Sequence, residues 1–341
     1  MNMTMETLYQ VLKQYFKQDV ITVEYDTITL HGGTVGNVSL VTGTAETADG
    51  QNLPYQIVLK IQSKWERYND PDSWRREYDL YMSDLGTTFS DTFRWPVCYY
   101  AEMNDEETGY QLWLEYIDGV TGLELSDDMY EQAALELGRY HGKLYAEQPA
   151  VLQNLTNLSH VDLMKNTYLY YRSWPLVYDY IRSENCDFPP HVRQMLIDID
   201  ENSDNIFARI EQLPVVLNHR DFWVTNIFYA DGKIALIDWD TSGWGYLGED
   251  LASLIADETD IDHMVEYYQR CIPAYYQGFA EYADAPSIAD HCVYEMILIV
   301  FGYRLIEGYL HAEAAEAKEQ YARTLQKIYE LKDSPLQSSV R

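Results

Sequence analysis

Three oxygen-bearing side chains in the second half of the chain have the chemistry to handle a proton and a metal ion. Asp221 and Asn226 lie in the largely apolar stretch LNHRDFWVTNIFY, and Asp238 follows the apolar run IALI. A carboxylate at the end of a buried strand is unfavourable unless it is paired, and a divalent cation would pair it. Because Mg²⁺ prefers hard oxygen ligands and takes few of them from protein, Asn226 and Asp238 fit a magnesium site. Asp221 could accept the proton of an attacking hydroxyl, and a purely structural hydrogen-bonded cluster is the alternative.

Two features of the first hundred residues could do chemistry: a glycine loop that could bind a phosphate group, and a lysine inside an apolar strand. The stretch HGGTVGNV holds Gly33 and Gly36 between two β-rich runs, where glycines let backbone N–H groups come close to a phosphate. It is neither a Walker loop nor a dinucleotide fingerprint, so a plain hairpin turn is the alternative. Lys60 lies inside the apolar strand QIVLKIQ. A buried ammonium needs a partner, for which Glu77 is the candidate; otherwise Lys60 belongs to an edge strand and points to water.

Two differently built parts of the chain must position these residues. Residues 1–117 open with an amphipathic helix over 5–18 and continue in β-rich runs broken by glycine and Asp-Gly turns. These runs predict a five-stranded, mostly antiparallel sheet with one helix, residues 73–86, inserted after the third strand.

Residues 118–341 show helical spacing instead. The stretch DDMYEQAALELGRYHGKLYAE places apolar side chains on one stripe, and further long helical segments follow it. Residues 215–240 interrupt them with two short β-runs around a turn at Asp231-Gly232. We therefore expect an α+β, two-lobed fold, with a small antiparallel-sheet N-lobe, a mostly helical C-lobe and a hinge-like connection near 117–122.

Composition excludes several classes of function. The formal net charge of −31 argues against nonspecific binding to a nucleic-acid backbone, which requires a positive field. No apolar run reaches transmembrane length, and the N-terminus lacks the pattern of a signal peptide. The four cysteines show no metal-ligand spacing and are expected to be free thiols in a reducing compartment. A cytoplasmic protein without nucleic-acid or membrane partners is the expectation.

The order of these features along the chain resembles the aminoglycoside phosphotransferase and choline kinase family. The features are the glycine loop, the strand lysine, the helix glutamate, the hinge, and the stretches HRDFWVTN and IDWD. That family has the protein-kinase-like fold. The stretches LGRYHGKLY and GEDLASL look like two further segments of the family. One departure is Arg220, which stands between the histidine and the aspartate where the family usually has glycine.

The resemblance implies a role for each candidate residue. Lys60 would contact the nucleotide phosphates and pair with Glu77, while the glycine loop of Gly33 and Gly36 would cover the phosphates. The backbone from Glu115 to Ile117 would hold the adenine of ATP, or the base of GTP. In the second lobe Asp221 would be the catalytic base, and Asn226 and Asp238 would hold Mg²⁺. His219 and Asp250 would have structural roles.

The acceptor substrate is less well defined by the sequence. The acidic stretch ADETDID and many tyrosines and tryptophans mark the helical part. Carboxylates together with aromatic faces suit an amine-bearing or quaternary ammonium acceptor, and aromatic faces also suit a sugar. The expected function is transfer of the γ-phosphoryl group of ATP or GTP to a hydroxyl of a small amine-bearing or sugar-like molecule.

Two other functions remain open from the residues alone. A non-catalytic, pseudokinase-like protein would bind nucleotide without transferring phosphate. A metal-dependent hydrolase would use His219, Asp221, Asp238 and Asp240, and would bind its metal without nucleotide.

Overall fold

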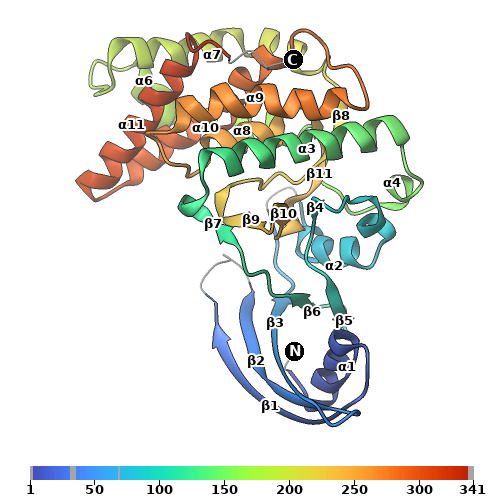
Figure 1. The fold of residues 1–341 in the computed structure, drawn as a ribbon. Helices are drawn as coiled ribbons and strands as arrows, with labels where there is room; N and C mark the ends of the chain where they lie inside the picture. Colours follow the sequence, from blue (N-terminus) through green and yellow to red (C-terminus); the bar gives the residue numbers. More distant parts are fainter. Residues whose placement is uncertain (1–2, 31–35, 68–69, 337–341) are drawn as a thin grey trace. The chain divides into compact units, whose positions relative to one another are not determined.

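The computed structural model describes residues 3–30, 36–67 and 70–336 (Figure 1). Its internal contacts divide the chain into two compact units. Unit 1 holds Met1–Gly119 together with two later segments, Ala150–Leu158 and Ala235–Asp240. Unit 2 holds Val120–Pro149, Ser159–Ile234 and Thr241–Arg341. Each unit is described by itself below.

Unit 1 is built on a five-stranded antiparallel sheet, as the sequence predicts. Its strand order is β1-β2-β3-β6-β5, and the strands are β1 (Val20–Thr29), β2 (Asn37–Thr47), β3 (Asn52–Ser63), β6 (Gly109–Glu115) and β5 (Cys98–Met103). Helix α1 (Met5–Phe16) begins at the cap Thr4, whose hydroxyl accepts from the Thr7 N–H. Its buried Leu8, Val11 and Leu12 pack with residues of β2, β3 and β6 to form the core of this face.

The sheet also carries a second cluster, which includes Trp74, Tyr110 and Leu112. The helix predicted over 73–86 is shorter in the structure: α2 spans Arg76–Tyr81, between the 3₁₀ turns η1 (Ser73–Arg75) and η2 (Asp84–Thr88). The break lies at Ser83, which is extended and accepts a hydrogen bond from the Leu85 N–H. A side chain that caps a new turn in this way competes with continuation of the helix. The short strand β4 (Phe93–Arg94) and helix α4 (Val151–Asn154) complete the regular elements that lie wholly in unit 1.

Unit 2 is mainly helical, as expected. Its helices are α3 (Asp127–Glu147), α5 (Leu163–Arg172), α6 (Pro175–Arg182), α7 (Pro190–Ile210), α8 (Glu249–Ala256), α9 (Met264–Ala280), α10 (Ala289–His311) and α11 (Ala315–Leu331). Helices α3 and α9 run side by side (Figure 1), and glycines allow their close approach. A Cβ at Gly138 would lie 2.0 Å from the Tyr275 carbonyl oxygen, and one at Gly278 would lie 2.2 Å from that of Leu135.

Short strands frame the loop that carries Asp221. Strand β8 (Val215–Asn218) pairs with β11 (Gly243–Tyr246), and β7 (Val120–Thr121) pairs with β9 (Ile227–Ala230). Strand β10 (Lys233–Leu236) follows β9 after the predicted turn, where Asp231 and Gly232 both have positive φ. The remaining 3₁₀ turns are η3 (Gly122–Glu124), η4 (Val224–Asn226) and η5 (Trp239–Thr241). None of the helices described is long and apolar enough to cross a membrane.

Candidate active site

The Lys60 ammonium is buried in unit 1 and shared by two carboxylates. Lys60 lies on the central strand β3, opposite Val38 of β2 and Leu112 of β6, and its side chain is 13% exposed. Its Nζ lies 2.5 Å from Oε2 of Glu77 and 2.5 Å from Oδ1 of Asp238. The pairing of Lys60 with Glu77 is therefore present, and the alternative of an edge-strand lysine in water is wrong. We refer to Lys60, Glu77 and Asp238 as the lysine cluster.

Opposing effects act on the charges of the lysine cluster. Burial alone would lower the pKa of Lys60, but the charges of Asp238 and Glu77 raise it well above its ordinary value. Burial raises the pKa of Glu77, and the Lys60 ammonium opposes that rise. The side chain of Glu77 is 1% exposed, whereas that of Asp238 is 31% exposed. Asp238 is therefore the member of the cluster that a ligand can reach most readily.

The segment that carries Asp238 is anchored in unit 1 by its neighbours. Trp239 is buried, its N–H lies 3.4 Å from Oε1 of Glu77, and its ring packs against Phe89. The Arg76 guanidinium donates to the Asp240 carbonyl oxygen at 2.8 Å and pairs in bidentate fashion with Asp70. These contacts hold the Asp238 backbone in the left-handed region, at φ 66°.

The predicted nucleotide-base and phosphate loops also lie in unit 1. The Glu115 carboxylate pairs with the Arg94 guanidinium at 2.6 and 2.9 Å, so the backbone is what residues 115–117 can offer to a base. Ile117 is buried. Gly36 has φ 91°, and a Cβ there would lie 2.2 Å from Oε1 of Gln62, so both conformation and space call for glycine. Gly33 lies outside the described residues.

Asp221 and Asn226 meet in the loop of unit 2 that follows β8. The Asn226 amide donates to Oδ2 of Asp221 at 2.8 Å and to the Asp221 carbonyl oxygen at 2.9 Å. Because the Nδ2 end is directed to Asp221, the Oδ1 end is the one that remains to coordinate a cation. The main chain of Asp221 donates to Nδ1 of His219 at 3.3 Å, so His219 shapes the loop from within.

A buried carboxylate on α8 holds the start of this loop. Asp250 accepts the N–H groups of His219 and Arg220, both at 2.7 Å. Burial raises the pKa of Asp250 to about 7, although these two donors favour its ionised form. His141 of α3 lies behind it, with Nε2 3.7 Å from Asp250 and Nδ1 2.7 Å from the Tyr275 hydroxyl. Burial lowers the pKa of His141 to about 3, so the ring is neutral and orders the site without adding charge.

Arg220 adopts a conformation that is normally left to glycine. Its φ is 66°, in the left-handed region, which disfavours a residue with a Cβ by about 1–2 kcal/mol. This explains in physical terms why glycine suits the position. In this chain the position is arginine, and its guanidinium is buried against the Trp244 carbonyl oxygen and Glu249.

Sequence reasoning missed several of these supporting residues. Arg76 stands directly before Glu77, and this adjacency is the only signal in the sequence that it could anchor the Asp238 segment. Glu249 stands directly before Asp250, yet nothing in its spacing points to Arg220. The predicted residues fall into two groups, one in each unit: the lysine cluster with Gly36, Glu115 and Ile117 in unit 1, and Asp221 with Asn226 in unit 2.

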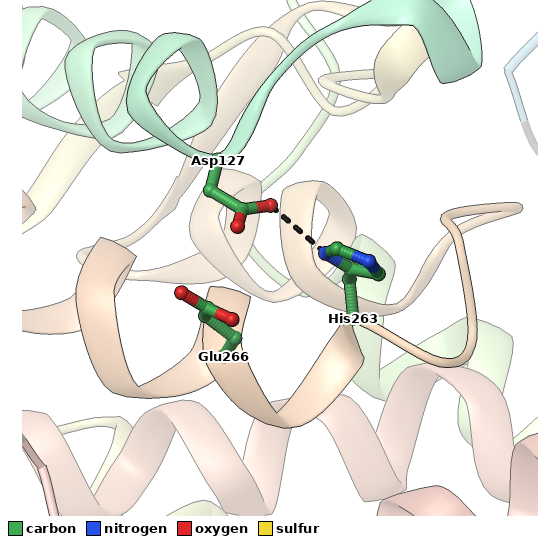
Figure 2. Close-up of side chains that lie close together, drawn as sticks. All are labelled: Asp127, His263 and Glu266. Atoms are coloured by element: carbon green, nitrogen blue, oxygen red, sulfur yellow. Dashed lines mark hydrogen bonds and ion pairs between the residues drawn. The ribbon is translucent and has the colours of Figure 1, made fainter.

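One further set of side chains in unit 2 has the composition of a metal site. Asp127, His263 and Glu266 face one another at the starts of α3 and α9 (Figure 2), and their ligand atoms lie within 4.8 Å of one another. His263 Nδ1 lies 3.0 Å from Asp127. The Arg270 guanidinium already lies 3.9 Å from Asp127 and 3.6 Å from Glu266, so the carboxylates have a cation. Ion pairing between the two helices accounts for the cluster.

Comparison with known proteins identifies the family to which the chain belongs. Residues 89–284, more than half of the chain, match the sequence profile of the Phosphotransferase enzyme family. Choline kinase from Cryptosporidium parvum Iowa II has a similar structure, with 17% identity, a TM-score of 0.57, and 91% of this chain and 90% of that chain covered. A microcompartment-associated aminopropanol kinase gives 15% identity, a TM-score of 0.56, and coverage of 96% and 95%.

A third similar structure is the GDP complex of aminoglycoside 2'-phosphotransferase-IIIa, with 13% identity, a TM-score of 0.56, and coverage of 96% and 99%. At such identities the likeness establishes the shared fold, and the predicted protein-kinase-like α+β fold is confirmed. A comparison with curated proteins by sequence found no match.

Proposed function

The chain belongs to the Phosphotransferase enzyme family, and from this premise we propose that it transfers the γ-phosphoryl group of ATP or GTP to a hydroxyl of a small amine-bearing molecule. Membership makes it a phosphotransferase with a hydroxyl acceptor, which removes the metal-dependent hydrolase from consideration. The nucleotide, the metal ion, the acceptor and the residue roles are the proposed part.

The observation that carries the proposal is the Asp221–Asn226 contact at 2.8 Å in the loop that Asp250 holds. Phosphoryl transfer requires little covalent work from protein; it requires positioning and neutralisation of charge. Asp221 orients the acceptor hydroxyl and takes its proton as the oxygen attacks phosphorus. The Lys60 ammonium, held in place by buried Glu77, binds phosphate oxygens in exchange for Asp238.

Two oxygen donors in the chain suit a hard cation. Asn226 directs its amide nitrogen to Asp221 and keeps Oδ1 for coordination, and Asp238 is the exposed carboxylate of the lysine cluster. Each is a donor of the kind that Mg²⁺ accepts, and each is proposed as a ligand. When bound, Mg²⁺ would neutralise the charge that develops on the phosphate oxygens.

The first experiment is a nucleotide-consumption screen with Mg²⁺ against aminoglycosides, amino alcohols and small sugars. Turnover of an amine-bearing acceptor is expected, and Asp221→Asn should lower kcat by about 10²- to 10⁴-fold. Thermal stabilisation by Mg-nucleotide should persist in this variant, because Asp221 serves the acceptor. Equal turnover by Asp221→Asn would refute the assigned base. Stabilisation by nucleotide without turnover of any acceptor would favour the non-catalytic alternative.

A cavity in unit 2 supports an amine-bearing acceptor. Its volume is about 200 Å³, and its lining includes Tyr171, Phe301, Tyr321, Asp257, Glu258, Glu307 and Arg304. Three carboxylates against one guanidinium leave the lining negative, which suits an ammonium group. Burial raises the pKa of Asp257, and the Arg304 guanidinium, 3.4 Å away, opposes that rise. This lining favours a cationic acceptor over a neutral sugar.

Substitution of the cavity carboxylates tests this part separately. Glu258→Gln and Glu307→Gln should each raise the KM of an amine-bearing acceptor several-fold while leaving the KM of the nucleotide unchanged. Glu201→Gln, at an exposed position on α7, is the matched control for loss of one negative charge. An acceptor KM that responds equally to all three substitutions would indicate general electrostatic attraction, and the cavity would then not be the acceptor site.

A further inference from the structure

Arg220, the residue directly before Asp221, lies in a left-handed turn, and its side chain contacts two neighbouring elements. Arg220 has φ 66°, and its N–H donates to Asp250 at 2.7 Å. Glycine takes this conformation without strain, whereas arginine requires contacts that compensate for its Cβ. The conformation of the chain at Arg220 sets the position of the Asp221 backbone, from which its side chain projects.

Those contacts are buried and come from two elements. The Arg220 guanidinium donates to the Trp244 carbonyl oxygen of β11 and lies 3.5 Å from Oε2 of Glu249, the first residue of α8. Glu249 in turn accepts the Tyr246 N–H at 3.1 Å. Gly245 leaves the space, because a Cβ there would lie 2.5 Å from Oε2 of Glu249. The strand and the helix are thereby both tied to the turn.

Burial distinguishes this arginine from one that binds a ligand. The Arg220 side chain is 5% exposed and that of Glu249 is 8% exposed. Nε and Nη1 of Arg220 are enclosed and have no hydrogen-bond partner within the part of the chain that the structure describes. Unsatisfied donors of this kind are unfavourable, so hydrogen-bond energy alone does not explain why the pair is present. The geometry that the Arg220–Glu249 pair imposes on the turn is a sufficient reason for the pair to be present.

We propose that Arg220 and Glu249 form a positioning pair that holds the turn before Asp221 and so aims its carboxylate. The role rests on the proposed function, in which Asp221 receives the acceptor proton. Neither residue touches substrate. Both act through the backbone between β8 and α8.

The kinetic test uses the full chain with Arg220→Ala, Arg220→Gly and the double variant Arg220→Gly/Glu249→Gln. Arg220→Ala keeps the strain and loses its compensation, so kcat is expected to fall about 10- to 100-fold with the KM of nucleotide and acceptor within twofold. The double variant should recover most of kcat, because glycine takes the turn freely and glutamine leaves no buried unpaired charge. Arg139→Ala, which removes a more exposed guanidinium of the same unit, should leave kcat unchanged.

Three results would overturn the positioning role. Wild-type kcat in Arg220→Ala would show that the pair is dispensable. An acceptor KM that rises while kcat is kept would show direct contact with the acceptor. A double variant as slow as Arg220→Ala would show that freeing the turn does not restore the aim of Asp221.

A second measurement does not depend on turnover. Hydrogen exchange of the His219 and Arg220 amides, which are bonded to Asp250, should accelerate in Glu249→Gln as well as in Arg220→Ala. Unchanged exchange in Glu249→Gln, the isosteric variant that should fold normally, would overturn the pair. If the wild type phosphorylates no acceptor, the proposed function fails while this measurement still decides whether the pair holds the turn.

Discussion

The lysine cluster of unit 1 and the Arg220–Glu249 pair of unit 2 both bury a cation against carboxylate, but they differ in what can reach them. Lys60 is shared between buried Glu77 and the more exposed Asp238. Arg220 is enclosed, and its partners are a main-chain carbonyl oxygen and a buried glutamate. The first arrangement has one carboxylate that is 31% exposed, whereas both side chains of the second are enclosed.

The difference separates two uses of buried charge. In the role proposed for Lys60, phosphate would take the place of the more exposed carboxylate, Asp238, while buried Glu77 stays in place. In the role proposed for Arg220, the charge is enclosed and bonded to a main-chain carbonyl oxygen. Since removing one member of a buried pair leaves the other uncompensated, both arrangements are expected to be sensitive to substitution, but with different consequences for turnover.

The largest effect is expected at Lys60. Lys60→Met leaves Glu77 buried without its counter-charge and should lower the free energy of unfolding by about 3–5 kcal/mol. Nucleotide-dependent stabilisation and turnover should both be lost. The double variant Lys60→Met/Glu77→Leu should regain stability in chemical denaturation but no activity. Regained activity in the double variant would contradict a phosphate-binding role for Lys60.

The second-largest effect is expected at Arg76, because its guanidinium holds the segment that carries Asp238. Lysine cannot reproduce the bidentate bond to Asp70 together with the bond to the Asp240 carbonyl, so Arg76→Lys should lower unfolding free energy by about 3 kcal/mol. Hydrogen exchange over residues 235–240 should accelerate. The neighbour Arg75, which pairs at the surface with Asp79, is the control, and Arg75→Lys should change stability by less than about 1 kcal/mol. Equal effects of the two substitutions would count against the anchoring role.

A smaller effect is expected when the space beside Glu249 is filled. In Gly245→Ala the new methyl group would press on Glu249 and on Asn218, which lies 2.7 Å from the Cβ position, and we expect a loss of about 2 kcal/mol. Because the shift moves Glu249 away from Arg220, kcat should fall with it. Gly232→Asn, in an open left-handed turn, is the control and should be nearly neutral in thermal unfolding. If Gly245→Ala changes neither stability nor kcat, the Arg220–Glu249 pair tolerates displacement of Glu249.

The smallest effect is expected at the exposed ion pairs between α3 and α9. The hydrogen bond to Asp127 and its charge raise the pKa of His263. Since the folded-state pKa exceeds the unfolded one, the contribution to stability is fully present below pH about 6.5 and is lost as the pH rises through the folded value. His263→Gln should flatten the dependence of the melting temperature on pH between about 6 and 8. If the variant keeps the wild-type dependence of the melting temperature on pH, that dependence comes from another titrating group.

Much of the fold could be predicted from local signals. Alternating apolar residues and turn glycines identify the five strands, and helical spacing identifies the long helices, because these patterns depend only on the period of each element. The helix over 73–86 was predicted too long because the capping by Ser83 is a local competition that periodicity does not register. The β8–β11 pairing was missed because residues 219–242, which include β9 and β10, separate the two short strands in the sequence.

The chemistry of the candidate site was visible in residue types and order, but only part of its support was. A lysine in an apolar strand, a glutamate in the next helix and the HRDFWVTN and IDWD stretches are unusual enough to be noticed in one sequence. Asp250, which holds the Asp221 loop, was assigned a structural role only through the family resemblance. Arg76 and Glu249 were not noticed, because their charges look ordinary in a chain of net charge −31.

The sequence by itself determined which groups with the chemistry for proton transfer and phosphate binding are present, and which elements carry them, because hydrophobic period and residue chemistry are local properties. Only the tertiary structure decided that Lys60 is shared by two carboxylates and that Arg220 is enclosed beside Glu249. The physical reason is burial: the energy of a charge depends on how far water has been excluded from it, and residues distant in the chain decide that exclusion.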